Sequence, residues 1–234
     1  MPTFEEIYAA HADDYDKLVE REDRNHQVLA AIQKIHPLDA ANVIELGAGT
    51  GRITRQIAPF VKTIRAFDGS AHMLGVARMR LEKQNCTNWS LEVADNASLP
   101  ATDASADVSI AGWSFGHQTA WANDWRQAIG AAVNEMLRVL RPGGTAIILE
   151  TLGTGVSDPA PPNETLAAYY EWLEQERGFQ KTWIRTDYEF ASLDEAVRLF
   201  RFFFGDSRAQ RVLDQGSVIV PECTGVWYYK RPST

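Results

Sequence analysis

From Asn42 onward, short apolar runs alternate with amphipathic stretches of helical length, and this alternation constrains the fold more than any other feature of the sequence. Apolar runs of this kind are typical of parallel strands that are buried on both faces, with the helical stretches as crossovers. Core strands are expected at residues 43–46, 63–67, 90–93, 108–111 and 145–149. Helices are expected at residues 52–60, 70–84 and 125–140. The pattern therefore predicts an α/β fold with right-handed crossovers.

The segments on either side of this core continue the same kind of pattern within one predicted domain of 234 residues. Residues 4–35 carry apolar side chains near helical spacing until Pro37, which predicts an N-terminal helical cap. We expect four parts: the cap at 1–40, a ligand-binding core at 41–155, an inserted lid helix at 156–180 and a tail at 181–234. The tail pattern predicts a strand at 182–190, helices at 193–204 and 207–213, and a closing strand at 225–230.

Charge and cysteine content restrict the possible partners and the compartment. The formal net charge is −8 and the Lys and Arg residues are scattered, which disfavours nucleic acid and membrane surfaces as partners. The start of the chain has neither a basic region nor an apolar stretch, so we expect a cytoplasmic protein. Cys86 and Cys223 lie far apart in the sequence, which predicts two buried thiols and neither a disulfide framework nor a metal site.

Residues 45–51 read Glu-Leu-Gly-Ala-Gly-Thr-Gly and lead from the first strand into a helix. Glycines in this context let the backbone turn sharply and approach a ligand. Asp68 ends the second strand about 20 residues further on, where a carboxylate can accept hydrogen bonds from both ribose hydroxyls of an adenosine. Arg52 replaces the third glycine of the dinucleotide fingerprint, and Glu45 would repel a pyrophosphate but bind an amino group. The sequence predicts a nucleoside ligand with a cationic end.

Four ordered segments, residues 45–51, 68–74, 94–100 and 137–144, resemble the motifs of class I S-adenosylmethionine-dependent methyltransferases, in particular the type 11/25-like small-molecule family. The resemblance implies a Rossmann-like, doubly wound, mostly parallel seven-stranded sheet whose last strand is antiparallel. It also implies S-adenosylmethionine as cofactor and methyl transfer to a small molecule.

The same resemblance assigns cofactor contacts along the chain. The methionine part is expected beside Glu45, Gly47, Ala48 and Gly49, and the ribose on Asp68. The adenine is expected between Met73, Asp95 and Asn96, and the sulfonium beside Gly112 and Trp113. Taken singly, Asp95 and Asn96 could instead cap a turn, and Met73 could belong to the core.

Two residues are candidates for catalytic roles. His117 follows the fourth strand at the carboxyl edge of the sheet and is a candidate general base, or else it caps the following helix. Tyr8, His11 and Tyr15 are spaced for one helical face, and an aromatic ring such as that of Tyr15 would attract the positive charge of a sulfonium. The alternative is that this face packs against the domain.

Aromatic residues are frequent in the last third of the chain, at 169–172, 202–204 and 227–229. Some of them must be core, and a few could line a pocket for a neutral, partly hydrophobic acceptor. Two other functions remain open. An NAD(P)-dependent oxidoreductase shares the glycine turn and the ribose carboxylate, and a non-catalytic S-adenosylmethionine-binding protein would share every motif.

Overall fold

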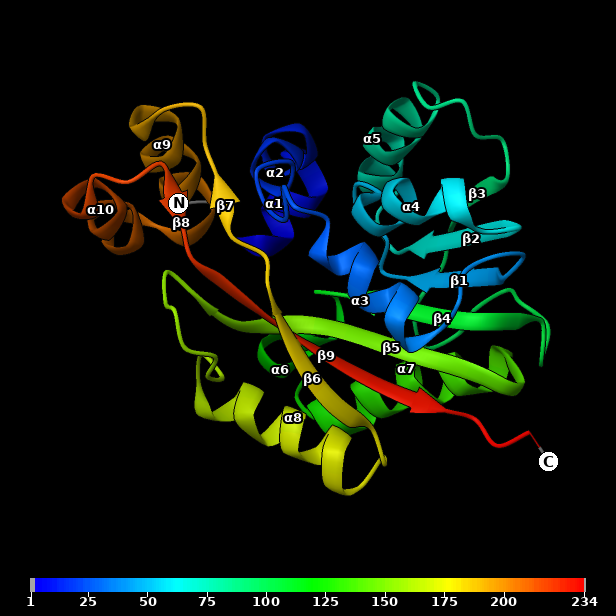
Figure 1. Ribbon diagram of the computed structural model, residues 1–234. Helices are drawn as coiled ribbons and strands as arrows, with labels where there is room; N and C mark the ends of the chain where they lie inside the picture. Colours follow the sequence, from blue (N-terminus) through cyan, green and yellow to red (C-terminus); the bar gives the residue numbers. More distant parts are fainter. Residues whose placement is uncertain (1–2, 234) are drawn as a thin grey trace.

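A seven-stranded sheet forms the centre of the protein, in the order β3-β2-β1-β4-β5-β9-β6 (Figure 1). The computed structural model describes residues 3–233. Neighbours from β3 to β5 are parallel, whereas β9 is antiparallel to both β5 and β6. The strands are β1 (Asn42–Leu46), β2 (Thr63–Asp68), β3 (Trp89–Val93), β4 (Ala106–Gly112), β5 (Leu140–Thr154), β6 (Gln180–Arg185) and β9 (Glu222–Lys230). The predicted fold class and the antiparallel last strand are confirmed.

Helices cover both faces of this sheet, because consecutive residues of the central strands are apolar and so both faces are apolar. Ile147 and Leu149 of β5 pack in a cluster with residues of α3 and α4, whereas Ala146 and Ile148 pack with residues of α7 and α8. All four side chains are fully buried, and each large one stabilises the fold by about 1.5–3 kcal/mol. These helices, with α5 beside β2 and β3, are α3 (Gln27–Ile35), α4 (Arg52–Ile57), α5 (Ala71–Leu81), α7 (Trp125–Val139) and α8 (Glu164–Gln175).

The helical pattern of residues 4–35 forms three helices instead of one: α1 (Phe4–Ala10), α2 (Ala12–Val19) and α3. The first break falls at His11, so the predicted common helical face of Tyr8, His11 and Tyr15 is wrong. The second break contains Asp23, whose backbone is left-handed with φ 58°. Its carboxylate accepts hydrogen bonds from the backbone N–H groups of Gln27 and Val28, at 2.7 and 3.1 Å, and thereby starts α3.

A buried carboxylate fixes α2 to the core. Asp16 has no exposed surface, and its Oδ2 accepts a hydrogen bond of 2.7 Å from Arg80 Nε of α5. Its Oδ1 lies 3.3 Å from Arg55 Nη2 of α4. A carboxylate held this way is costly to leave unpaired, so the two arginines hold α2 over the sheet edge that carries the glycine turn.

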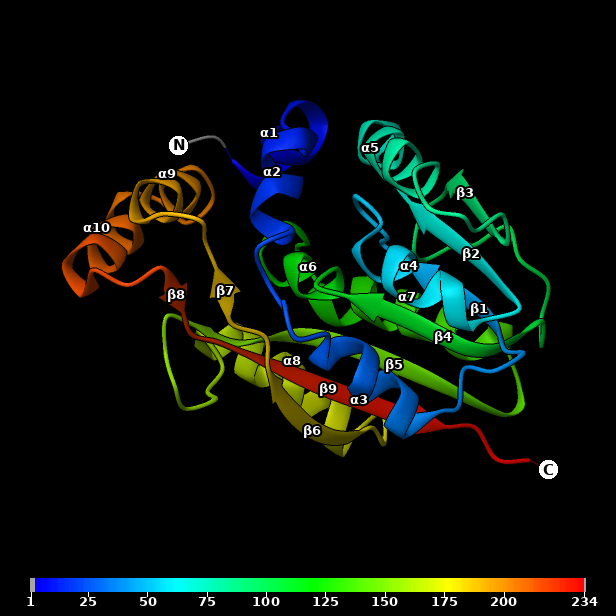
Figure 2. The same cartoon turned by 45° about the horizontal axis from the view of Figure 1, so that its top comes forward.

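The tail builds a small second body beside α1 and α2 (Figure 2). The strand predicted at 182–190 is divided into two, because β6 ends at Arg185 and β7 (Tyr188–Glu189) pairs with β8 (Ile219–Val220) in place of the main sheet. Asp187 redirects the chain between them, since its Oδ1 accepts hydrogen bonds from Arg185 Nε and the Glu222 N–H. Helices α9 (Leu193–Phe204) and α10 (Asp206–Gln215) complete this body, and Leu18 of α2 packs into its apolar cluster.

The aromatic residues of α8 belong to the core. Tyr169, Tyr170 and Trp172 are buried, and the Tyr170 ring lies 4.4 Å from that of Trp227 in β9. The Trp227 indole N–H donates a 3.0 Å hydrogen bond to Glu174. The inserted helix therefore lies against the sheet along most of its length.

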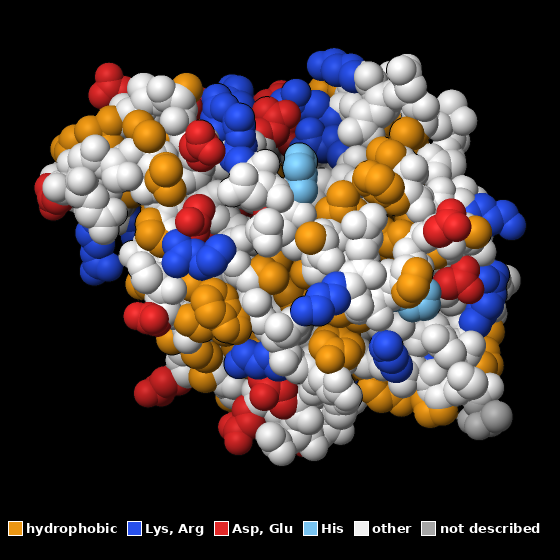
Figure 3. Space-filling model, viewed as in Figure 1, with side chains coloured by type: hydrophobic (Ala, Val, Ile, Leu, Met, Phe, Trp, Pro, Cys, Tyr) orange, Lys and Arg blue, Asp and Glu red, His pale blue; other side chains and the backbone are white. Residues whose placement is uncertain are grey.

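Side chains of different charge are mixed on the surface face that Figure 3 shows, and the two thiols are free. On the face drawn in Figure 3, basic, acidic and apolar side chains are interspersed. Across residues 3–233, no helix is both long and apolar enough to pass through a bilayer. Cys223 is buried as predicted, but Cys86 is only half-buried, and both are free.

Candidate functional site

The turn between β1 and α4 has the backbone conformation that its glycines allow. Gly47 and Gly49 have φ values of +67° and +55°. A Cβ on Gly47 would lie 1.9 Å from Ser114 Oγ, so no larger residue fits there without moving Ser114. The Ala48 N–H donates a 2.9 Å hydrogen bond to the Phe67 carbonyl of β2, which joins the turn to the neighbouring strand. The turn therefore exposes backbone at the carboxyl edge of the sheet.

Asp68, the last residue of β2, faces this turn. Its Oδ2 accepts a 2.8 Å hydrogen bond from the Gly49 N–H, and its Oδ1 accepts one of 2.8 Å from the Ser70 N–H. Burial raises the pKa of this carboxyl, and the two backbone N–H groups oppose the shift. Each oxygen keeps a further lone pair, so the carboxylate is oriented and can still bind a pair of hydroxyl groups.

Glu45, at the end of β1, is a buried carboxyl beneath the turn. It is 1% exposed, and its Oε2 accepts a 2.5 Å hydrogen bond from Thr54 Oγ1. Burial, together with the nearby Asp68 charge, raises its pKa to about 8, although the hydrogen bond from Thr54 acts to lower it. A buried carboxyl without a cation is costly to ionise, so an ammonium group is the chemical partner that this position favours.

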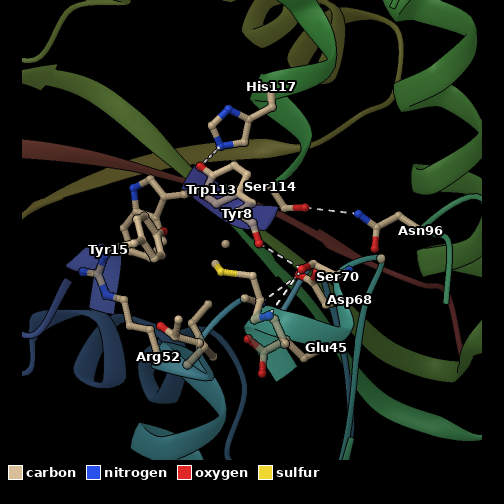
Figure 4. A pocket seen from close by; sticks show the side chains of 18 of the residues that line it. Tyr8, Tyr15, Glu45, Arg52, Asp68, Ser70, Asn96, Trp113, Ser114 and His117 are labelled. Atoms are coloured by element: carbon tan, nitrogen blue, oxygen red, sulfur yellow. Dashed lines mark hydrogen bonds between the residues drawn. The ribbon is translucent and has the colours of Figure 1, made fainter. Parts of the chain in front are cut away.

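All of the residues predicted for the site line one cleft of about 930 Å³ (Figure 4). They are Tyr15, Glu45, Gly47, Ala48, Gly49, Asp68, Met73, Asp95, Asn96, Gly112, Trp113 and His117. The structure thus brings together strand ends and loops from five separate parts of the chain, at the edge where open α/β sheets bind ligands.

One wall of the cleft combines Asn96 and Met73. Asn96 Nδ2 donates a 3.1 Å hydrogen bond to Ser114 Oγ, while its buried Oδ1 has no partner among the described residues. An unpartnered buried acceptor indicates a ligand with a donor such as an amino group. Met73 is buried, and Asp95 is exposed with its Oδ1 capping the Ala97 N–H.

The opposite wall contains His117, which lies half-buried and stacks on Trp121 at 4.9 Å. Its Nε2 lies 2.9 Å from the Tyr8 hydroxyl, a contact between residues that are 109 positions apart. Desolvation lowers the pKa of His117 to about 4, so the imidazole is neutral at pH 7. Burial raises the pKa of Tyr8 well above 10, so the phenol keeps its proton and donates it to Nε2 in the imidazole tautomer that is protonated on Nδ1. His117 is the N-cap residue of α6 (Gln118–Trp121), but its side chain makes no capping hydrogen bond to this helix.

A second cavity of about 370 Å³ adjoins the cleft. The two share a wall made of Tyr8, Tyr15, Val19, Arg52, Trp113, His117 and Trp121. The rest of the second cavity comes from α1 and α2, the loop after β4, the end of β5, the start of α8 and the tail. It is partly apolar through Leu18, Leu166, Phe203 and Phe204. Three glutamates also line it: Glu22, Glu150 and Glu222.

Several residues of the two cavities escaped the sequence analysis. Glu150 stands at the carboxyl end of the apolar run of β5, as Glu45 and Asp68 stand at the carboxyl ends of β1 and β2. This position in the sequence could have identified Glu150 as a site residue. Ser114 adjoins the predicted Trp113, and Ser70 caps α5. Glu22 and Glu222 carry no local signal, because only the tertiary fold brings them together.

The fold and this cleft define a Rossmann-like α/β protein with a site for a nucleoside-bearing ligand. Residues 43–144 match the family model described as methyltransferase domain. These residues, fewer than half of the chain, are therefore similar to a methyltransferase domain. The structure of an S-adenosylmethionine-dependent methyltransferase from Aquifex aeolicus, at 14% identity and a TM-score of 0.55, shares the fold.

Three similar proteins illustrate the match. The uncharacterized protein YafE of Escherichia coli is 33% identical over 109 residues, 47% of this chain and 49% of that protein. Malonyl-[acyl-carrier protein] O-methyltransferase of Pectobacterium atrosepticum is 29% identical over 141 residues, 60% of this chain and 49% of that protein. The chain thus spans about half the length of these curated relatives. The crystal structure of YcgJ from Bacillus subtilis, at 15% identity, covers 89% of this chain and 100% of its own with a TM-score of 0.63, which shows the shared fold.

Proposed function

We propose that the protein transfers a methyl group from S-adenosylmethionine to a small, partly apolar molecule that occupies the second cavity. The observation that carries the proposal is the wall shared by the two cavities, because it places a ligand of the cleft directly beside a ligand of the second cavity. Scattered basic side chains on the surface favour a small acceptor over nucleic acid. A cytoplasmic location stays part of this proposal.

The residues of the cleft fit the cofactor. Asp68 would hold the ribose, because each of its oriented oxygens keeps a lone pair. Glu45 would bind the amino group of the methionine part, beside the backbone of Gly47, Ala48 and Gly49 and near Gly112. Asn96 Oδ1 would accept from the adenine amino group, with Asp95 and Met73 adjoining the ring.

The bound cofactor supplies an activated methyl group on a sulfonium. The chain then needs mainly to hold the acceptor in line, at about 3–3.5 Å. Tyr15 in the shared wall offers a neutral aromatic ring to a positive charge, whereas the Arg52 guanidinium already lies 3.8 Å from the centre of the Trp113 ring. Neutral His117, in the tautomer protonated on Nδ1, would take a proton from the acceptor through the Tyr8 hydroxyl, which lies 2.9 Å from its Nε2.

The two alternatives differ in what they require of the site. A nicotinamide-dependent oxidoreductase must hold a pyrophosphate at the turn, where the buried Glu45 carboxyl and the Arg52 side chain replace the usual fingerprint. A non-catalytic S-adenosylmethionine-binding protein needs the cleft but no acceptor cavity, and the second cavity argues against it.

Calorimetric titration of the full chain with S-adenosylmethionine, S-adenosylhomocysteine and NADH tests the proposal. We expect heat with the first two and none with NADH. Asp68→Asn should weaken S-adenosylhomocysteine at least about tenfold, since its amide opposes a backbone N–H donor. The exposed Asp103→Asn is the matched control. Binding of NADH alone would refute the proposal, and cofactor binding without S-adenosylhomocysteine release from any acceptor in a metabolite panel would favour the non-catalytic alternative.

A further inference from the structure

The second cavity contains buried carboxyl groups that the proposed methyl transfer does not use. Glu222 is 2% exposed, and Oε1 accepts a 2.8 Å hydrogen bond from Thr151 while Oε2 has no partner within residues 3–233. Glu22 is 8% exposed, and its Oε1 likewise has no partner there. Both residues line the cavity, so it presents unpartnered acceptor oxygens beside apolar walls.

The cations of the described chain leave two of these carboxyls unpaired. Glu22 Oε2 lies 2.8 Å from Arg52 Nη1, which compensates one charge. Glu150, 4% exposed, accepts from the Gly116 N–H at 2.8 Å, and no cation of the described chain pairs with it or with Glu222. Arg208 also lines the cavity, but its Nη1 bonds the Thr154 carbonyl and its guanidinium lies 5.4 Å from the Phe204 ring centre. Two buried carboxyls therefore remain without a cation.

The groups around these carboxyls favour neither a metal ion nor an anionic ligand as their partner. In the described part of the chain, no three His, Cys, Asp or Glu residues are arranged to hold a metal ion. The guanidinium of Arg52 lies flat over the Trp113 ring, 3.8 Å from its centre, and its Nε and Nη2 have no partner in residues 3–233. A ligand carboxylate at those nitrogens would approach the carboxyls of Glu22 and Glu222, which disfavours an anionic ligand.

The walls of the second cavity are largely apolar and can bind the apolar part of a ligand. Phe203, Phe204, Trp113 and Trp121 give the cavity aromatic surfaces, and Leu18 and Leu166 add aliphatic ones. Aromatic faces attract cations as well as apolar groups, and carboxylates pair with ammonium groups by charge-assisted hydrogen bonds. We propose that the second cavity selects an amine that is cationic at neutral pH and carries an apolar body, with Glu22 and Glu222 binding its ammonium group. This inference rests on the proposed function and specifies its acceptor class.

Burial, together with the Glu22 charge, raises the pKa of Glu222 to about 8, although hydrogen bonds from Thr154 and Thr151 and the charge of Arg52 act to lower it. At pH 7 Glu222 is therefore mostly protonated in the empty cavity, so an ammonium ligand must release this proton when it binds. An alcohol of the same shape would bind without proton release, because it can accept from the protonated carboxyl. The protonation change thus separates the two ligand classes.

The test uses the full chain saturated with S-adenosylhomocysteine and three probes of one size: 4-phenylbutylamine, 4-phenylbutanol and 4-phenylbutyrate. We expect calorimetry at pH 7 to give at least tenfold tighter binding for the amine than for the alcohol and no binding for the carboxylate. The heat of amine binding should vary with the ionisation enthalpy of the buffer, and Glu222→Gln should remove the preference for the amine while leaving alcohol binding unchanged. Glu171→Gln, an exposed change on α8, is the matched control.

The same titration separates this inference from the proposed function. Absence of S-adenosylhomocysteine binding would refute the proposed function itself. If S-adenosylhomocysteine binds but the alcohol binds as well as the amine, the carboxyls act as neutral groups and the inference is wrong. Preference for the carboxylate would assign the site to Arg52, and no binding of any probe at millimolar concentration would equally overturn the amine class.

Discussion

Gly47→Ala should damage both the fold and the cofactor site, and the structure gives the size of the effect. A left-handed backbone with φ +67° costs an alanine about 1–2 kcal/mol. The new Cβ would lie 1.9 Å from Ser114 Oγ, so Ser114 must move and lose its 3.1 Å hydrogen bond from Asn96, at about another 1 kcal/mol. The sum of about 2–3 kcal/mol corresponds to a melting temperature lower by about 4–12 °C in a domain of this size.

Urea denaturation and calorimetry with S-adenosylhomocysteine measure the two effects separately. We expect at least about tenfold weaker binding, because the displaced turn and Ser114 both line the cleft. Gly75→Ala is the control, since Gly75 is exposed within α5 and a Cβ there meets nothing within 4 Å. That change should raise the free energy of unfolding by about 0.5–1 kcal/mol. A Gly47→Ala protein with wild-type stability and wild-type affinity would refute the reasoning.

Two further predictions concern the titratable groups of the cleft. Glu45 is protonated below its pKa of about 8, and an ammonium ligand binds the ionised form, so S-adenosylhomocysteine affinity should rise from pH 6 to 8 and then level off. Calorimetry across this range should show a flat profile for Glu45→Gln, and a rising profile in that variant would contradict the assignment. His117→Ala and Tyr8→Phe should each lower kcat about 10²-fold with cofactor affinity nearly unchanged, and the double variant should lose no more than either one. Unchanged kcat in steady-state assays of His117→Ala would remove the base role.

The sheet and the cofactor cleft were predictable because their signals are local. The core strands are apolar on both faces, as at Ile147 and Ile148, so they appear in the sequence as continuous runs. Glu45 and Asp68 end adjacent parallel strands, and the carboxyl ends of parallel neighbours meet at one edge. Strand order and spacing therefore place Glu45 and Asp68 at the cleft, whereas Met73, Asp95 and Asn96 were expected there from the family resemblance.

Other features depend on contacts between distant segments, and the sequence contains no local sign of them. The left-handed Asp23 that divides the N-terminal helices is not a glycine, so composition did not predict a break there. Asp187 turns the chain out of the sheet only because the Glu222 N–H reaches its carboxylate. The pairing of Tyr8 with His117 needs α1 to lie across the loop after β4, which follows from the packing of α1 and α2 on α5.

The cofactor cleft and the second cavity are built from different parts of the fold. The cofactor cleft uses strand ends of the sheet, so its residues are held by the backbone hydrogen bonds of the core. The second cavity contains Leu18 from the cap, Leu166 from the inserted helix and Phe203 from the tail. Of its carboxyls, Glu22 belongs to the cap and Glu222 to strand β9 of the tail. We expect substitutions there to alter the acceptor with little effect on the turn, because the two sites are connected through the shared wall. The acceptor class is therefore encoded in the cap and the tail, and exchanging Glu222 should change which molecule is methylated before it changes whether the cofactor binds.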